Sequence, residues 1–237
     1  YGFGFSRNWV SKKADAFWAL TPEVAKEVIH RGYPQKKVLV LGPLFDPSFE
    51  SVLETTKNQE ESSLPLLVLG AGANGSNNHI DLLNALLPLA GRIKIVALCG
   101  RRDSTKNQLQ EWITLHPELS VEALGFQGPA EMAKLYQEAW AMVARPGART
   151  ATEALATGCV LIFNGFGSTM PQELLARRYF HSKGIDVAIE NPSNLLDKVI
   201  DWLEQPQKYC LIRQIYQQKP LIGNRNEIRD LILGSSG

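Results

Sequence analysis

The stretch Leu64-Pro-Leu-Leu-Val-Leu-Gly70 leads through Ala71-Gly-Ala-Asn-Gly-Ser76 into Ile80-Asp-Leu-Leu-Asn-Ala-Leu-Leu87. Its first part is a continuous apolar run, which is typical of a strand buried on both faces of a parallel sheet. Its last part is amphipathic, which predicts a helix. The stretch therefore predicts one strand, a glycine-containing turn and one helix.

The same unit recurs along the chain. The alternation of apolar runs with helical patterns predicts right-handed βαβ crossovers and a parallel sheet covered by helices on both faces. The expected fold class is α/β, with a Rossmann-like parallel sheet. The other expected strands are 93–98, 120–124, 139–144, 160–163 and 186–189, and the expected helices between them are 104–115, 130–138, 150–157 and 171–182.

The regions on either side of this pattern differ from it. Thr21-Pro-Glu23 predicts a helix start, because it combines a capping threonine with a proline at the first helical position. Residues 37–41 predict a further strand. The expected segments are 1–45 as the trailing edge of a preceding domain and hinge, 46–62 as a linker, 63–190 as the main domain, 191–233 as C-terminal helices, and 234–237 as a tail or residues added by cloning.

Composition argues against several classes of protein. The chain has 237 residues, 25 of them basic and 24 acidic, and this balance does not fit a general nucleic-acid binder. Cys99, Cys159 and Cys210 form no CxxC pair or Cys/His cluster, so neither a zinc site nor a disulfide framework is predicted. The apolar runs are too short to span a bilayer and no secretory signal is evident, so we expect a cytoplasmic protein. Since Tyr1 is not a natural start residue, we interpret the sequence as part of a longer protein.

Four loops that follow strands carry candidate binding residues, because ligands of open parallel sheets bind beyond the carboxyl ends of the strands. The first loop contains Gly72, Asn74, Gly75 and Ser76, whose backbone N–H groups would approach an anion at a helix start. Glycines at such turns are also common for steric reasons alone. The spacing is neither that of a P-loop nor that of a dinucleotide fingerprint.

The second loop, Arg145-Pro-Gly-Ala-Arg-Thr-Ala-Thr-Glu153, allows two interpretations. In one, Thr150 caps the helix and Glu153 reaches back to its N–H group as a capping box. In the other, Glu153 points from the first turn towards a ligand and accepts hydrogen bonds from a ribose diol. The two uses are compatible, because a carboxylate has two oxygens.

Two more loops and a pair of arginines complete the set. Gln172 and Glu173 either bind sugar hydroxyls or form a polar first turn next to a proline. Residues 124–129 offer backbone groups that would read a base edge. Arg101 and Arg102 either neutralise a pyrophosphate or are simply solvated. Four such loops in one α/β domain favour a nucleotide-diphosphate ligand.

Taken together, these elements resemble glycosyltransferase family 28 over residues 14–182, and most closely over 138–173. The segment from Arg145 to Gly158 is similar to the family signature (R/K)-x-G-x-x-T-x-x-E-x-x-x-x-G at the same spacing. Pro171-Gln-Glu173 resembles its Gly-Gln-Glu segment. Cys99-Gly-Arg101 and Gly125-Phe126 resemble segments of the galactolipid branch, and Val40 to Phe49 is similar to the family's domain junction.

The resemblance implies a GT-B fold whose second domain binds a UDP-sugar as substrate, without a cofactor or a metal ion. Under it, residues 1–45 are the trailing edge of the acceptor domain. Glu153 would hold the ribose, Gln172 and Glu173 the donor sugar, and main-chain atoms of Phe126 and Gln127 the uracil. Residues 72–76 and Arg145 would face the diphosphate. The implied donor-binding residues are Gly72, Asn74, Gly75, Ser76, Arg101, Phe126, Gln127, Arg145, Gly147, Thr150, Glu153, Gln172 and Glu173.

The implied activity is inverting transfer of a hexose or N-acetylhexosamine to a lipid-linked acceptor at a membrane surface. Two features depart from the family pattern. Asp46 stands where the family has an arginine near the phosphates, so either Arg101 and Arg102 compensate for its charge or the donor differs. The family's acceptor loop with its histidine is not in this chain, so no catalytic base is named. The alternatives are a UDP-sugar 2-epimerase-like enzyme, a non-catalytic donor-binding subunit that docks on a separate acceptor protein, and a degenerate nucleotide-binding domain.

Overall fold

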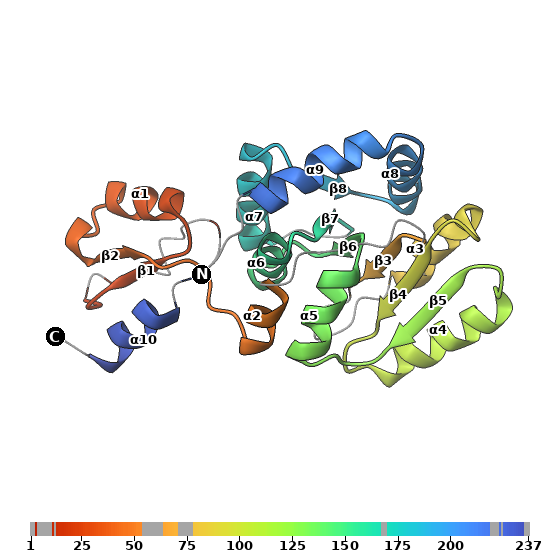
Figure 1. The fold of residues 1–237 in the computed structure, drawn as a ribbon, viewed down its shortest axis with the longest axis horizontal. Coiled ribbons are helices and arrows are strands. Elements are labelled where there is room, and N and C mark those ends of the chain that lie inside the picture. Colours follow the sequence, from red (N-terminus) through yellow and green to blue (C-terminus); the bar gives the residue numbers. More distant parts are fainter. Residues whose placement is uncertain are drawn as a thin grey trace.

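The chain is described here by a computed structural model, which covers residues 3, 11, 13–53, 64–70, 78–166, 170–218, 223 and 225–234. The side chains of residues 50, 51, 53, 172, 225, 231 and 232 are outside this description. The covered residues form a small and a large unit, which lie side by side in Figure 1. The small unit contains β1, α1 and β2, and helix α10 lies next to it.

The large unit is built on a six-stranded parallel sheet with the order β5-β4-β3-β6-β7-β8. The chain fills one half of the sheet outward from β3 and then crosses over to build the other half outward from β6. This is the doubly wound arrangement, whose switch point lies between β3 and β6. The strands are β3 (Leu66–Leu69), β4 (Lys94–Leu98), β5 (Ser120–Leu124), β6 (Ala141–Ala144), β7 (Val160–Asn164) and β8 (Val187–Ile189).

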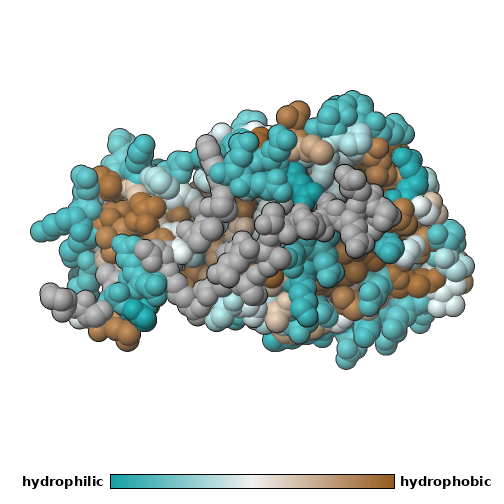
Figure 2. Space-filling model, viewed as in Figure 1, coloured by the Kyte–Doolittle hydropathy of each residue, from teal (hydrophilic) through white to brown (hydrophobic). Residues whose placement is uncertain are grey.

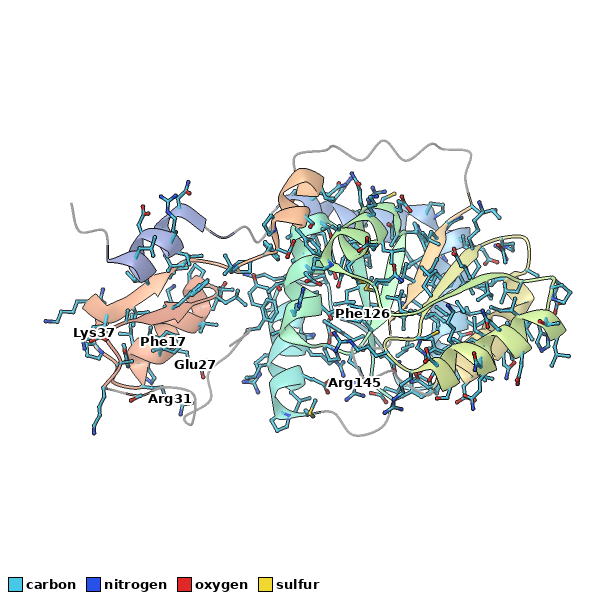
Figure 3. All side chains as sticks on the ribbon, turned by 90° about the horizontal axis from the view of Figure 1, so that it is seen from below. Phe17, Glu27, Arg31, Lys37, Phe126 and Arg145 are labelled. Carbon is cyan, nitrogen blue, oxygen red and sulfur yellow. The ribbon has the colours of Figure 1, made fainter. Side chains whose placement is uncertain are left out.

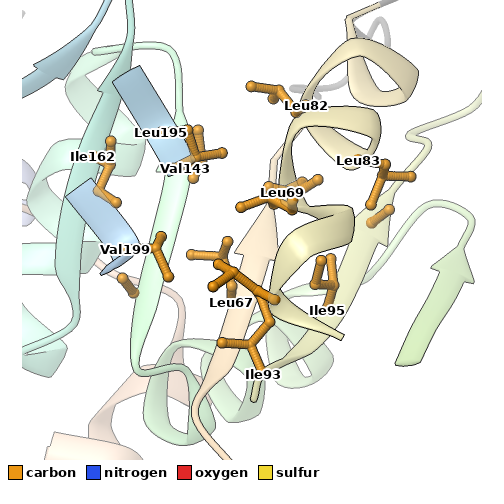
Figure 4. Packing of buried hydrophobic residues seen from close by; sticks show 14 of the residues in the cluster. Leu67, Leu69, Leu82, Leu83, Ile93, Ile95, Val143, Ile162, Leu195 and Val199 are labelled. Atoms are coloured by element: carbon orange, nitrogen blue, oxygen red, sulfur yellow. The ribbon is translucent and has the colours of Figure 1, made fainter. Parts of the chain in front are cut away.

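Helices cover both faces of this sheet, as the continuous apolar strands predict. On one face, Leu67 and Leu69 pack beneath α3 and α8 (Figure 4). On the other face, Val68 belongs to a second buried cluster with residues of α5, α6 and α7. The helices of the large unit are α3 (His79–Leu86), α4 (Asp103–Leu115), α5 (Pro129–Glu138), α6 (Ala148–Thr157), α7 (Pro171–Ser182), α8 (Pro192–Glu204) and α9 (Pro206–Gln218), with the 3₁₀ turn η3 (Leu87–Leu89) after α3.

The small unit consists of two parallel strands, β1 (Phe17–Ala19) and β2 (Val38–Val40), joined by α1 (Pro22–His30) and the short turn η2 (Gln35–Lys37). Thr21 caps α1 as predicted, since its side chain accepts from the Val24 N–H group at 3.3 Å. β1 was not predicted from the sequence, because it is a strand of three residues whose partner lies about twenty positions later. Apolar side chains reach the surface over this unit in Figure 2, and Val40 is 48% exposed.

Two segments outside the repeating α/β pattern pack against parts of the chain that are distant in sequence. Helix α2 (Pro47–Leu53) occupies the start of the stretch 46–62, which the sequence analysis assigned to a linker, and it packs against α5 and α6. Its Phe49 is 1% exposed in the second cluster. The chain before α10 (Arg225–Leu233) approaches the junction so closely that a Cβ on Gly223 would overlap the Pro43 carbonyl. Among the described helices, none is both long and apolar enough to cross a bilayer.

Candidate functional site

A pocket of about 280 Å³ lies at the carboxyl ends of β3, β4, β5 and β6. It spans the point between β3 and β6 where the order of the strands reverses, which is where doubly wound sheets bind their ligands. Four of the residues predicted from the sequence meet there, Phe126, Gln127, Thr150 and Glu153. The lining residues are Gly70, Leu98, Gly100, Gly125, Phe126, Gln127, Pro129, Met132, Met142, Ala144, Arg149, Thr150 and Glu153.

Glu153 forms the buried acidic part of the pocket wall. It is 7% exposed, and its Oε1 accepts a hydrogen bond from Arg149 Nε at 2.8 Å. Burial raises the pKa of the Glu153 carboxyl, whereas the hydrogen bonds from Arg149 and from the hydroxyl of Tyr136 lower it. The carboxylate is thus held in place by two donors and faces a space that has room for a ligand.

The capping-box interpretation of Thr150 and Glu153 is wrong. Helix α6 begins at Ala148, and its N-cap residue is Gly147, which makes no side-chain cap hydrogen bond. The chain leaves β6 through a tight turn in which the Gly147 N–H donates to the Arg145 carbonyl at 2.8 Å, so helical geometry starts early. Thr150 therefore lies inside the first turn, and the Glu153 carboxylate is used for other contacts.

Phe126 and Gln127 form the opposite wall, at the end of β5. Phe126 is 52% exposed, and the guanidinium carbon of Arg101 lies 4.4 Å from the centre of its ring. The Gln127 side-chain amide donates to the Gly125 carbonyl at 3.2 Å, which holds the loop in a compact conformation. The ring of Phe126, held by the cation of Arg101, offers a flat surface of the kind on which a planar base stacks. Base recognition by main-chain atoms of this loop stays a prediction.

Arg145 and Glu173 contact each other rather than the pocket. Arg145 Nε and Nη2 donate to the two carboxylate oxygens of Glu173 at 3.1 and 2.6 Å, and Nη1 donates to the Phe166 carbonyl at 2.6 Å. Glu173 is 3% exposed and also accepts from the Met170 N–H at 2.9 Å, at the start of α7. Figure 3 shows Arg145 and Phe126 in the large unit. The predicted roles of Arg145 at the diphosphate and of Glu173 at the sugar stay predictions.

The glycine-containing loop lies outside the described residues. Gly72, Asn74, Gly75 and Ser76 therefore cannot be placed, and the side chain of Gln172 is likewise outside the description. The flanking residues are well packed. The buried His79 opens α3, and its Nε2 lies 3.0 Å from the Leu98 carbonyl at the end of β4. Burial lowers the pKa of His79, which favours the neutral ring.

Asp46 lies near Arg149, the basic residue of the pocket lining. Its Oδ1 accepts hydrogen bonds from the Ser48 N–H at 3.0 Å and from the Ser48 hydroxyl at 2.8 Å, at the start of α2. Its charge also acts on Arg149, whose pKa is raised by Glu153 and, to a smaller extent, by Asp46. The sequence analysis offered Arg101 and Arg102 as compensation for this carboxylate. The structure instead places Arg149 next to it.

Arg149 and Tyr136 are the site residues that sequence reasoning missed. Arg149 stands four positions before Glu153, and an Arg and a Glu at this spacing face each other on a helix, so the signal was available. Tyr136 reaches Glu153 from α5, seventeen positions away in the chain, and no local pattern links the two. In the described part of the chain, no three His, Cys, Asp or Glu side chains form a group suited to a metal ion.

Comparison with known proteins identifies the family of the large unit. A family model described as the glycosyltransferase family 28 C-terminal domain matches residues 66–214, from the start of β3 into α9. The chain is 26% identical over 216 residues to the processive diacylglycerol beta-glucosyltransferase of Bacillus pumilus, and the match covers 90% of this chain and 55% of the relative. The chain spans about half the length of the curated relatives it matches.

Solved structures share the fold. The UDP-GlcNAc 2-epimerase of Neisseria meningitidis, bound to UDP-GlcNAc, gives a TM-score of 0.65 at 16% identity over 94% of this chain and 62% of that one. MurG of Acinetobacter baumannii gives a TM-score of 0.61 at 17% identity over 94% of this chain and 74% of that one. The expected Rossmann-like α/β fold with GT-B relatives is confirmed.

Proposed function

This chain belongs to glycosyltransferase family 28, and on that premise we propose that it forms the UDP-sugar-binding part of an inverting glycosyltransferase. The observation that carries the proposal is the position of Glu153. The signature glutamate of the matched domain lies in the wall of the switch-point pocket, nearly buried and oriented by Arg149 and Tyr136. A buried carboxylate at this place in a doubly wound sheet suits a ribose diol, to which it offers two acceptor oxygens.

The remaining wall fits the other parts of a nucleotide. Phe126 supplies a flat surface and Gln127 an amide at the end of β5, both suited to a base. Met132, Met142 and Leu98 supply apolar contact. A pocket of this kind, apolar with a few polar groups that fix orientation, is typical of small-molecule sites. The nucleoside would occupy the pocket, and the diphosphate would extend along the start of α6.

In the proposed reaction, an acceptor hydroxyl oxygen attacks the anomeric carbon of the sugar while the bond from that carbon to UDP breaks. UDP leaves with the bonding electron pair, and the hydroxyl proton passes to a general base. Because Glu153 is the only carboxylate in the described pocket lining and is assigned to the ribose, we place the base outside this pocket. The departing diphosphate needs donors aimed at its developing charge, and the first-turn N–H groups of α6 have no side-chain cap to compete for them.

The acceptor is a further part of the proposal. The curated relative is named a diacylglycerol glucosyltransferase, so we propose a hexose or N-acetylhexosamine donor and a lipid-linked acceptor at a membrane surface. Residues 1–45 would be the edge of the acceptor domain. The apolar surface over β1, β2 and α1 supports this assignment, because a sheet of two strands with three residues each buries little by itself (Figure 2).

An epimerase is the second candidate, since an epimerase of known structure shares the fold. The family match and the named curated relatives favour the glycosyltransferase. A non-catalytic donor-binding subunit and a degenerate nucleotide-binding domain would both leave the pocket without turnover. Transfer from a UDP-sugar to diacylglycerol by a protein that joins this chain to an acceptor domain would exclude both, whereas interconversion of the sugar without an acceptor would favour the epimerase.

The nucleotide preference tests the proposal with the chain as it stands. We expect UDP to bind with a dissociation constant below about 1 mM. ADP should bind at least about tenfold more weakly, because we assign the loop with Phe126 and Gln127 to the edge of a uracil, whose donors and acceptors an adenine does not match. Isothermal titration calorimetry measures both. Absence of UDP binding at millimolar concentration, or equal binding of ADP and UDP, would contradict the proposal.

A further inference from the structure

We propose that Arg149 is the residue that binds the diphosphate of the sugar nucleotide, and that it does so by exchanging its partner, from Glu153 to phosphate. The inference rests on the proposed function, because it names a residue of the same pocket. Neither the family signature nor the residues predicted from the sequence assign a role to this position. The cations near the pocket differ in what they already contact.

Arg149 is the one basic side chain among the described residues that line the pocket. Its side chain is 75% exposed and is anchored through Nε alone, which donates to Glu153 Oε1 at 2.8 Å. The two terminal nitrogens of the guanidinium make no hydrogen bond to the described residues. Because only one hydrogen bond to the described residues holds this guanidinium, it can leave Glu153 and present its fork of N–H donors to a phosphate, which it binds through two parallel hydrogen bonds.

Arg145 and Arg101, the two arginines assigned to the donor from the sequence, contact other groups. All three guanidinium nitrogens of Arg145 donate to Glu173 or to the Phe166 carbonyl. The guanidinium of Arg101 lies over the ring of Phe126, on the base side of the pocket. Arg149 lies at the start of α6, beside Thr150. Of these three cations, Arg149 is the one placed for the phosphates.

The partner exchange explains how Glu153 becomes available to the ribose. In the structure, the carboxylate is bound by Arg149 and by Tyr136. A ribose diol donates two hydrogen bonds and needs acceptor positions on the same two oxygens. When the guanidinium turns to the diphosphate, Glu153 keeps Tyr136 and gains the diol. Nucleoside and diphosphate would then bind cooperatively, because each uses one member of the same ion pair.

Asp46 works against this exchange. Its carboxylate acts on Arg149 from the start of α2, in addition to Glu153. The Asp46→Asn variant keeps the side-chain oxygen that accepts from the Ser48 N–H, and asparagine is as good a cap as aspartate. We expect it to bind UDP about two- to threefold more tightly at low salt, with the gain falling as salt screens the charge. Calorimetry at two ionic strengths measures this, and weaker UDP binding by the variant would contradict the assigned direction.

The decisive experiment compares UDP with uridine in the full chain. For Arg149→Gln, we expect UDP binding to weaken about tenfold while uridine binding changes by less than about threefold, since uridine carries no phosphate. The Arg149→Lys variant keeps the positive charge but loses the fork of N–H donors. Its affinity for UDP should therefore lie between those of the unaltered chain and of the Arg149→Gln variant. Arg177→Gln is the matched control, because its pair with Asp186 lies outside the pocket. It should leave both affinities unchanged.

The outcomes separate this inference from the proposed function. An equal loss of UDP and uridine binding in Arg149→Gln would show that Arg149 only supports the pocket, and no loss of either would show that it does not bind phosphate. Each result overturns the inference. If UDP binding depends on Glu153 but not on Arg149, the inference alone fails. If the unaltered chain binds neither UDP nor uridine, the proposed function fails as well, and the inference with it.

Discussion

Replacing Glu153 with glutamine should weaken UDP binding about 100-fold, because a hydrogen bond to a charged acceptor in a nearly buried site contributes roughly 1.5–3 kcal/mol and the ribose donates two of them. The pocket geometry gives this residue no substitute, since Glu153 is the only carboxylate of the described lining. The loss should appear in calorimetric titration with UDP, with thermal unfolding recorded alongside to show that the variant is folded.

A substrate change isolates the ribose contact. The unaltered chain should bind 2′-deoxy-UDP more weakly than UDP, because one hydroxyl donor is missing. The Glu153→Gln variant should bind the two nucleotides with similar affinity, because its contact to the diol is already lost. If the variant still distinguishes UDP from 2′-deoxy-UDP as strongly as the unaltered chain does, Glu153 does not bind the ribose and the proposed site is wrong.

The inner strands β3, β4, β6 and β7 were predictable because they are largely buried on both faces. Continuous apolar runs such as 93–98 and 160–163 fit few structures other than a buried strand. The strands found there, β4 and β7, agree with the predicted ranges within one residue at each end. The weakly predicted parts are short or depend on distant partners. β1 has three residues and pairs, within the described residues, with β2 alone. Helix α2 is held by burial of Phe49 against α5 and α6. The local sequence therefore predicts neither β1 nor α2.

The candidate site was predictable in part, since four of the residues proposed from the sequence line the pocket, whereas their binding roles stay predictions. The loop positions follow from the strand ends, and Glu153 follows from its place in the signature. The failed capping box shows the limit of spacing alone. A Thr-x-x-Glu pattern marks a helix start only when helical geometry begins after the threonine, and here the turn at Gly147 starts it two residues earlier. Contacts such as Arg145 with Glu173 join positions far apart in the chain and depend on the order of β6 and β7 in the sheet.

Replacing Arg145 with methionine should lower the free energy of unfolding by about 3 kcal/mol, which is the lower end of the range for removing one partner of a buried ion pair. The variant leaves the Glu173 carboxylate, with 4% of its side chain exposed, without a cation. We choose the lower end because the Arg145 side chain remains 31% exposed and water can reach its position. For a chain of this length, the melting temperature should fall by roughly 6–12 °C.

The double variant Arg145→Met with Glu173→Gln tests whether the uncompensated charge is the cause. Glutamine is neutral and keeps an oxygen for the Met170 N–H group, so the double variant should regain part of the lost stability even though it carries one more substitution. Arg31→Met is the control, because the pair of Arg31 with Glu27 is exposed on α1 (Figure 3) and should contribute less than about 1 kcal/mol. Chemical denaturation measures all three. A double variant less stable than Arg145→Met would mean that the pair stabilises the chain through its hydrogen bonds, and that Glu173 tolerates burial of its charge without Arg145.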